Sequence, residues 1–171
     1  MTRESPIPAA AVAFVRDTTQ GIEVYLNKRP AHFRYYPGAF VFPGGRLDET
    51  DADLQAAACR EVKEEIGVEI DSNALVLLRE VHTNAKAGPV YHMHTFAYVV
   101  EGEWQTELNA EEIDEEIWIT ASRALDKLYL PYQISAAIYT ISRFAKVEEL
   151  LQALAGGSIR DEYHLHKDFW L

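Results

Sequence analysis

The residues with the clearest chemical potential are three glutamates in the stretch "REVKEEIGV", residues 60–68. Glu61, Glu64 and Glu65 follow an i, i+3, i+4 spacing, so on a helix their carboxylates converge on one face. Like charges at this spacing repel one another. A run of Glu and Lys is commonly a solvated helix face, but carboxylate oxygens at this spacing also suit Mg²⁺ or Mn²⁺. The same negative charges that repel one another would attract a divalent cation and so favour metal binding.

The segment that precedes this helix favours the metal-site interpretation. A short apolar run ends in "FPGG", residues 42–45, and a polar loop then leads into the glutamate-bearing segment. Two adjacent glycines let the backbone approach a ligand closely and expose a carbonyl oxygen as a further metal ligand. Arg60 lies one turn from Glu64 and would orient or partly neutralise the carboxylates.

The stretch "GGRLDETDADLQAAACREVKEEIGV" resembles the Nudix box, whose usual form is G-x5-E-x7-R-E-U-x-E-E-x-G-U with U aliphatic. The second half of the box matches at Arg60, Glu61, Val62, Glu64, Glu65, Gly67 and Val68. The resemblance covers residues 42–68 at motif level, and most of the chain in the order of its elements. It implies an α/β/α sandwich in which a mixed β-sheet lies between helices.

The first half of the box departs from the pattern. The segment from Gly45 to Arg60 is one residue longer than usual, and Asp51 stands where a glutamate is expected. Asp51 either braces the loop and Arg60 or caps the helix N-terminus, and both interpretations stay open. A longer loop with aspartate resembles the coenzyme A diphosphatase branch, although the extra motif of that branch is not recognisable upstream of FPGG.

The resemblance implies an enzyme in which water attacks a phosphorus of a nucleoside diphosphate linked to another moiety. It implies Glu61 and Glu65 as metal ligands, Glu64 as a third and the Gly45 carbonyl as a fourth, with Mg²⁺ or Mn²⁺ as the cofactor. Arg60 would hold the glutamates in place. The alternative is a non-catalytic module of the same fold that binds a ligand or regulates. Such a module is expected to lose box glutamates, and all three are present.

The resemblance implies that the general base is a glutamate, either in the box or on a later loop. The segment "NAEEIDEEIWIT" offers Glu111, Glu112, Glu115 and Glu116 just before an expected strand. Glu112 is preferred because it falls in the loop rather than in the strand. Solvated loop charge is the competing explanation for this acidic run.

The predicted substrate-binding residues are Arg29, Phe42, Gly44, Gly45 and His92. His92 and His94 alternate on an expected strand, so both point to one face, where they line the substrate pocket, are half-buried, or bind a transition metal. Tyr35 and Tyr36 precede FPGG and suit either stacking on a base or packing in a loop.

These residues must be positioned by strands interleaved with helices, which predicts an α/β or α+β layered domain over residues 1–171. We expect a hairpin of residues 9–16 and 22–29, and strands at 39–42, 74–83, 91–100 and 115–120. The first helix should run from Asp51 or Asp53 to Ile66, with Cys59, Val62 and Ile66 packed on the sheet. A helical turn at 121–128 and one long helix from Gln133 to Ala155 should follow.

Composition excludes several classes of partner. The chain has 171 residues, 48% of them hydrophobic, and a formal charge of −11, which disfavours nucleic acid and anionic membranes. A small anionic substrate would need divalent cations to screen the same repulsion. The single cysteine rules out an internal disulfide, and no apolar run approaches the roughly 18 residues of a membrane helix, so we expect a cytoplasmic protein. The apolar end "DFWL" favours docking on its own domain or on the partner of a homodimer.

Overall fold

The computed structural model describes residues 5–83, 89–157 and 159. The C-terminal "DFWL", on which the homodimer prediction rests, lies outside these residues. Within the part that is described, none of the helices has the length and apolar character needed to cross a membrane.

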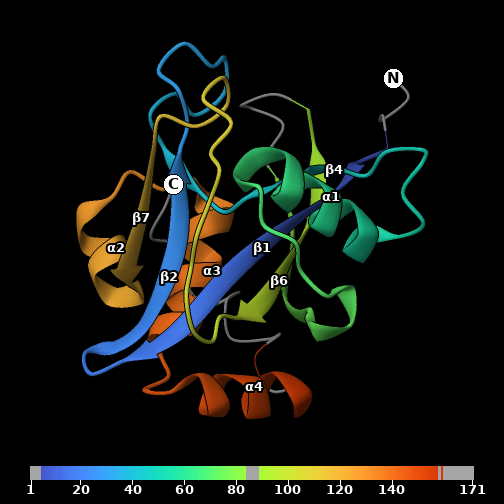
Figure 1. Cartoon of the computed structure of the whole chain (residues 1–171). Coiled ribbons are helices and arrows are strands. Elements are labelled where there is room, and N and C mark those ends of the chain that lie inside the picture. Colours follow the sequence, from blue (N-terminus) through green and yellow to red (C-terminus); the bar gives the residue numbers. More distant parts are fainter. Residues whose placement is uncertain (1–4, 84–88, 158, 160–171) are drawn as a thin grey trace.

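A mixed seven-stranded sheet forms the centre of the molecule (Figure 1). Five strands pair in the order β3-β2-β1-β6-β5 with β5 at one edge, while β4 pairs with β1 and β7 pairs with β2. Only the β1–β6 pair is parallel among the pairings of the described residues. The strands are β1 (Ile7–Thr18), β2 (Gly21–Lys28), β3 (Phe40–Val41), β4 (Gly44–Arg46), β5 (Val76–His82), β6 (Tyr91–Val99) and β7 (Glu115–Thr120).

Helices cover both faces of this sheet, as the sequence predicted. The helices are α1 (Leu54–Ile66), α2 (Ala121–Lys127), α3 (Tyr132–Ser142) and α4 (Val147–Ala155). β1 is buried along most of its length, which explains its nearly continuous apolar sequence. Val12 and Phe14 pack with α1, whereas Ala13 and Val15 belong to a second core with α2, α3 and α4. The resulting arrangement is an α/β/α sandwich (Figure 1).

α1 begins and ends where its local sequence dictates. Asp53 is the N-cap, and its carboxylate accepts a 2.8 Å hydrogen bond from the backbone N–H of Ala56. Gly67 ends the helix in the left-handed conformation, with φ of 71°. The face that packs on the sheet contains Ala58, Val62 and Ile66, while Cys59 is only partly buried.

The prediction of one long C-terminal helix was wrong, because α3 and α4 are separate helices. α3 ends at Ser142, and the chain turns before α4 begins at Val147. Asp17, at the end of β1, accepts a 3.0 Å hydrogen bond from the backbone N–H of Val147. This contact supplies one of the acceptors that a new helix start requires. Ala145 is exposed at the turn.

The sheet splits where β1 and β2 separate, and the split positions the FPGG segment. β2 pairs with β1 over residues 21–24, and farther along it pairs with β3 instead. The opposite half of β1, residues 9–11, pairs with β4. The FPGG segment thus crosses from β2 to β1, and the backbone N–H of Val12 donates to the Pro43 carbonyl at 2.9 Å. Sequence reasoning expected the β4 part of this segment to be loop.

We predict that Asp17→Ala lowers the free energy of unfolding by about 1 kcal/mol, since α4 loses a side-chain acceptor at its start. Chemical denaturation followed by circular dichroism measures the change. Asp17→Asn is the matched control and should retain most of the stability, because an amide oxygen also accepts from Val147. Equal stability of all three proteins would contradict this account of the helix break.

Candidate active site

The two glycines of FPGG lie directly against the glutamate face of α1. The backbone N–H of Gly44 donates a 3.0 Å hydrogen bond to Oε2 of Glu65. A Cβ on Gly45 would stand 2.3 Å from Oε1 of Glu61, and one on Gly44 would stand 2.2 Å from the carbonyl oxygen of Ala10. Gly44 also has φ of 156°, which side chains rarely adopt. Only glycine at both positions allows the helix and the strand to approach this closely.

Arg60 connects the loop before α1 to the carboxylates on the helix. Its Nε and Nη2 donate to the two carboxylate oxygens of Asp51 at 3.0 and 2.9 Å. Its Nη1 donates to Glu61 at 2.8 Å and to Glu64 at 3.1 Å, and its Nη2 also donates to the Arg46 carbonyl. One guanidinium therefore offsets part of the repulsion among the carboxylates.

The structure decides between the two interpretations of Asp51. Asp51 braces Arg60 and also accepts a 2.8 Å hydrogen bond from the backbone N–H of Asp48, whereas the helix cap is Asp53. The Asp51 side chain is only 5% exposed. Its pair with Arg60 holds the pKa of Asp51 below its usual range, so Asp51 stays ionised as a fixed counter-charge.

The three glutamates of the box differ in burial, and therefore in the roles that they can have. Burial raises the pKa of Glu65 to about 8, and the charges of Glu61 and Glu112 add to this rise against the opposing Gly44 hydrogen bond. Burial also raises the pKa of Glu61, although Arg60 counteracts it. The Glu64 side chain is 57% exposed. Glu61 and Glu65 therefore form an inner pair that faces the glycines, and Glu64 lies at the solvent side.

This inner pair fits a hard divalent cation. Its donor atoms are carboxylate oxygens, which Mg²⁺ and Mn²⁺ prefer. Without a cation, Glu65 favours holding a proton at neutral pH, as its pKa of about 8 indicates, and burial raises the pKa of the partly buried Glu61 as well. A divalent cation would replace that proton and relieve the repulsion. Glu61, Glu64 and Glu65, with the Gly45 backbone, are the candidate ligands.

The acidic loop before β7 reaches the same region, because it is fixed to the end of α1. The backbone N–H groups of Glu107 and Asn109 donate to the Ile66 and Glu65 carbonyls, each at 2.8 Å. Glu112 is exposed, accepts from the Asn109 side chain at 2.9 Å, and lies close enough to raise the pKa values of Glu61 and Glu65.

The other acids of this loop have different surroundings. Glu115 pairs with Lys28, and Glu116 accepts hydrogen bonds from the hydroxyls of Tyr25 and Thr106. The backbone N–H of Glu111 donates to the Asn109 side chain. Of these four glutamates, Glu112 is the one whose charge acts on Glu61 and Glu65.

A cavity of about 260 Å³ opens on the other side of Gly44 and Gly45. Two guanidinium groups belong to its wall, from Arg29 and Arg46. Arg29 donates to the Tyr35 carbonyl at 3.1 Å, and Arg46 donates to the Tyr91 hydroxyl at 2.6 Å. The lining residues are Ala9, Arg29, Tyr35, Tyr36, Gly44, Gly45, Arg46, Thr83, Pro89, Tyr91, Met93 and Gln133.

Two predicted substrate-binding residues lie outside this cavity. Phe42 is 3% exposed and packs in the core with α2, α3 and α4. His92 lies between Tyr91 and Met93 on β6, and those two line the cavity, so His92 points to the opposite face of the sheet. Phe42 and His92 are therefore not part of the cavity wall, whereas Arg29, Gly44 and Gly45 lie in it.

Sequence reasoning missed Arg46 and Tyr91 as cavity residues. The alternation within "YHMH" contained the signal for Tyr91, because choosing one face of the strand for the histidines leaves the other face to Tyr91 and Met93. Tyr36, weighed as a stacking or packing residue, is held at φ of 50°, the only positive value for a non-glycine among the described residues. An unusual backbone conformation at a cavity wall is a feature of functional positions.

Comparison with known proteins agrees with this fold. The NUDIX domain model matches residues 6–138. A curated relative, the uncharacterized Nudix hydrolase NudL of Enterobacter sp. (strain 638), is 45% identical over 60 residues, which are 35% of this chain and 30% of that protein. The chain belongs to the Nudix family.

Solved structures confirm the fold. A NUDIX hydrolase from Alicyclobacillus acidocaldarius aligns with a TM-score of 0.77 at 19% identity, over 90% of this chain and 97% of that one. The NUDIX domain of Shewanella oneidensis NrtR, complexed with ADP ribose, aligns with a TM-score of 0.66 at 16% identity, over 80% and 86% of the two chains.

We predict that the metal-free protein loses stability as the pH rises from about 4.5 to about 8. Over this interval folded Glu65 keeps a proton that the unfolded chain releases, because its pKa is about 8 rather than the usual 4.5. Thermal unfolding in the presence of a chelator measures the effect. Glu65→Gln should flatten the profile, and Mg²⁺ should raise the melting temperature at pH 8. A wild-type profile as flat as that of the variant would contradict the burial of this carboxyl.

We predict that Asp51→Ala costs about 2 kcal/mol of unfolding free energy and weakens Mg²⁺ binding, since Arg60 loses the partner that holds it. Denaturant unfolding and calorimetric Mg²⁺ titration measure the two effects. Asp53→Ala removes only a helix cap and should cost about 1 kcal/mol with unchanged Mg²⁺ affinity. Mg²⁺ affinities that remain the same in both variants would refute the bracing role.

Proposed function

We propose that this protein is a divalent-metal-dependent hydrolase that cleaves the pyrophosphate bond of a nucleoside diphosphate linked to another moiety. The observation that carries the proposal is the position of the Glu61–Glu65 pair against Gly44-Gly45, with an arginine-bearing cavity on the other side of the same glycines. Membership of the Nudix family supports pyrophosphate hydrolysis as the reaction type.

The α1 carboxylates would hold the metal. In this proposal Glu61 and Glu65 bind Mg²⁺ or Mn²⁺ directly, and Glu64 and the Gly45 carbonyl complete the set. A bound divalent cation neutralises charge that develops on the phosphate oxygens and lowers the pKa of a bound water. Arg60 keeps Glu61 and Glu64 oriented through hydrogen bonds of 2.8 and 3.1 Å, with Asp51 as its anchor.

The cavity supplies groups of the kind that a nucleotide requires. The chain carries a net charge of −11, yet Arg29 and Arg46 place two cations in the cavity wall, where they would bind phosphate oxygens. Tyr35, Tyr36 and Tyr91 supply aromatic surfaces for a base or ribose. ADP ribose, which the Nudix domain of NrtR binds, is a molecule of this chemical class.

Glu112 is the proposed general base. It is exposed at the end of a loop that is fixed to α1, and its charge influences Glu61, Glu65 and Arg29. An ionised carboxylate there would accept the proton of the attacking water while the glutamates of α1 remain committed to the metal.

A substrate panel tests the proposal. Purified protein is incubated with Mg²⁺ or Mn²⁺ and with ADP-ribose, coenzyme A, dinucleotide polyphosphates and nucleoside triphosphates, and the products are identified by mass spectrometry. Two phosphomonoester products from a diphosphate-linked substrate are expected. Binding of one of these compounds without turnover under any metal condition would instead favour a non-catalytic ligand-binding module.

We predict that Glu65→Gln lowers kcat by at least about a hundredfold while the fold is retained, because the amide cannot supply an anionic oxygen to the metal. Steady-state kinetics on the best panel substrate and circular dichroism provide the two readouts. Glu69→Gln changes an exposed glutamate just beyond the same helix, paired only with Lys63 in the structure, and should leave kcat unaltered. Undiminished turnover in Glu65→Gln would refute the assigned metal site.

A further inference from the structure

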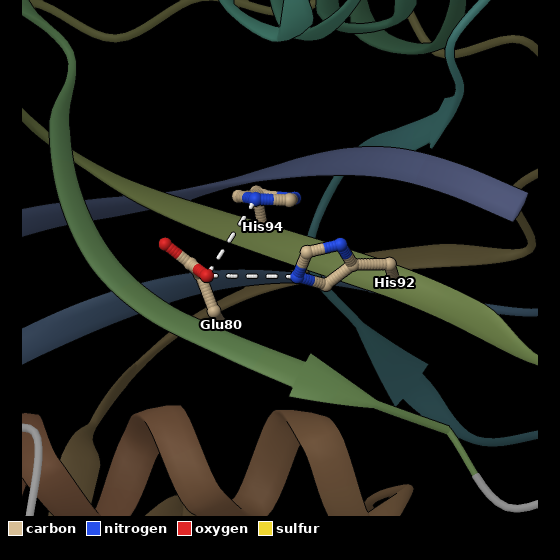
Figure 2. A group of neighbouring side chains, drawn as sticks. All are labelled: Glu80, His92 and His94. Atoms are coloured by element: carbon tan, nitrogen blue, oxygen red, sulfur yellow. Dashed lines mark ion pairs between the residues drawn. The ribbon is translucent and has the colours of Figure 1, made fainter. Parts of the chain in front are cut away.

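A second cluster of metal-binding side chains lies on β5 and β6, away from the glutamates of α1. Glu80 projects from β5, and His92 and His94 project from β6 toward it (Figure 2). Oε2 of Glu80 lies 3.5 Å from Nε2 of His92 and 3.9 Å from Nε2 of His94. The three residues offer one ligand atom each, and these atoms all lie within 4.8 Å of one another.

The register of the sheet brings these residues together. Glu80 is the cross-strand partner of His94, and His82 is the partner of His92. A register shift between Leu77 and Arg79 leaves Leu78 as an extra, buried residue on β5. An extra residue reverses the alternation of side chains beyond it, so Glu80 shares a face with both histidines.

The geometry of the two imidazole rings is compatible with metal binding. The imidazole rings of His92 and His94 lie 4.2 Å apart, a distance at which two charged rings would repel one another. Neutral imidazoles keep the lone pairs that ligate metals. His82 stacks on His92 with the rings inclined at 11°, which restrains the orientation of the His92 ring.

We propose that Glu80, His92 and His94 bind a transition-metal ion of the Zn²⁺ type at a site that is separate from the glutamates of α1. Two imidazole nitrogens and one carboxylate form a donor set that Zn²⁺ accepts, with ligand bonds of about 2.0–2.1 Å and one coordination position left for water or an external ligand. Tetrahedral geometry at such lengths separates the ligand atoms by about 3.3 Å, so small side-chain rotations close the site.

The second site would act independently of the first. Along the sheet, His94 pairs with Ala10 of β1, and Ala10 pairs with Gly45 of β4. Two strand spacings of about 4.8 Å therefore separate His94 from Gly45, on which a Cβ would meet Glu61. Paired metals that share one reaction lie only about 3.5–4 Å apart. We therefore assign the ion at Glu80, His92 and His94 a structural role that joins β5 to β6, with access from solvent because Glu80 is 46% exposed.

The donor atoms make the two sites chemically distinguishable. Mg²⁺ prefers the carboxylates of α1, and imidazole selects Zn²⁺ or Co²⁺. The test is therefore calorimetric titration of the full chain with Zn²⁺ in excess Mg²⁺, together with the visible spectrum of the Co²⁺-loaded protein. One tight equivalent of Zn²⁺ is expected in the wild type and in Glu65→Gln. The melting temperature should rise by about 5 °C when Zn²⁺ exceeds its dissociation constant a hundredfold.

Substitutions within the cluster should weaken this binding. His94→Gln and His92→Gln should each reduce Zn²⁺ affinity at least about tenfold and abolish the Co²⁺ spectrum, and Glu80→Gln should reduce affinity by about 10- to 100-fold. Circular dichroism verifies that each variant is folded, and Glu80→Gln, the most exposed position, remains informative if a histidine variant does not fold.

The matched control is the double variant H164Q/H166Q, which removes the only other His-x-His pair in the sequence. This variant should retain the single equivalent of Zn²⁺. The proposal is overturned if Zn²⁺ affinity survives in His92→Gln and His94→Gln, or if binding is lost in Glu65→Gln or in the control instead. None of these readouts depends on hydrolysis, so the result stands apart from the proposed activity.

Discussion

The repulsion among three carboxylates on one face of α1 is the constraint around which this structure is organised. Arg60 offsets part of it through Glu61 and Glu64, and Asp51 anchors Arg60 in turn. The Gly44 N–H offsets another part at Glu65. These contacts require the FPGG segment to reach α1, and it does so because β1 and β2 separate and leave β3 and β4 to bridge them. Burial raises the pKa of Glu65, and so does repulsion among the carboxylates that these contacts only partly offset; a bound cation would offset the rest.

The sheet keeps different chemistry on its two faces. On β6, Tyr91 and Met93 line the cavity, while His92 and His94 face the other way toward Glu80. Gly44 and Gly45 lie between the glutamates of α1 and the cavity. Their backbone contacts α1 and also forms part of the cavity wall. Residues without side chains are suited to this position, since a Cβ on either glycine would displace its neighbours. In this way an acidic protein has arginines on one side of the two glycines and carboxylates on the other.

Much of the fold could be predicted because its signals are local. The apolar runs of β1, β2, β5, β6 and β7, the start of α1 near Asp53 and its end at Gly67 all follow from neighbouring residues. The predicted long helix failed because Asp17, distant in sequence, caps α4 and allows the chain to turn there. The sequence alone does not show that Phe42 and His92 lie outside the cavity wall, because that depends on the burial of Phe42 and on which face of β6 turns toward the cavity.

The sequence by itself determined the spacing of Arg60, Glu61, Glu64 and Glu65, because helical periodicity alone places these residues on adjoining faces. It also contained the glycines that a close approach requires. Only the tertiary structure decided which carboxylates are buried, that Asp51 holds Arg60, and that Glu112 lies beside the inner pair. It alone brought Glu80 to the two histidines, since an extra residue in β5 sets which face Glu80 occupies. Burial, electrostatic coupling and cross-strand register depend on segments far apart in the chain, so no local pattern encodes them.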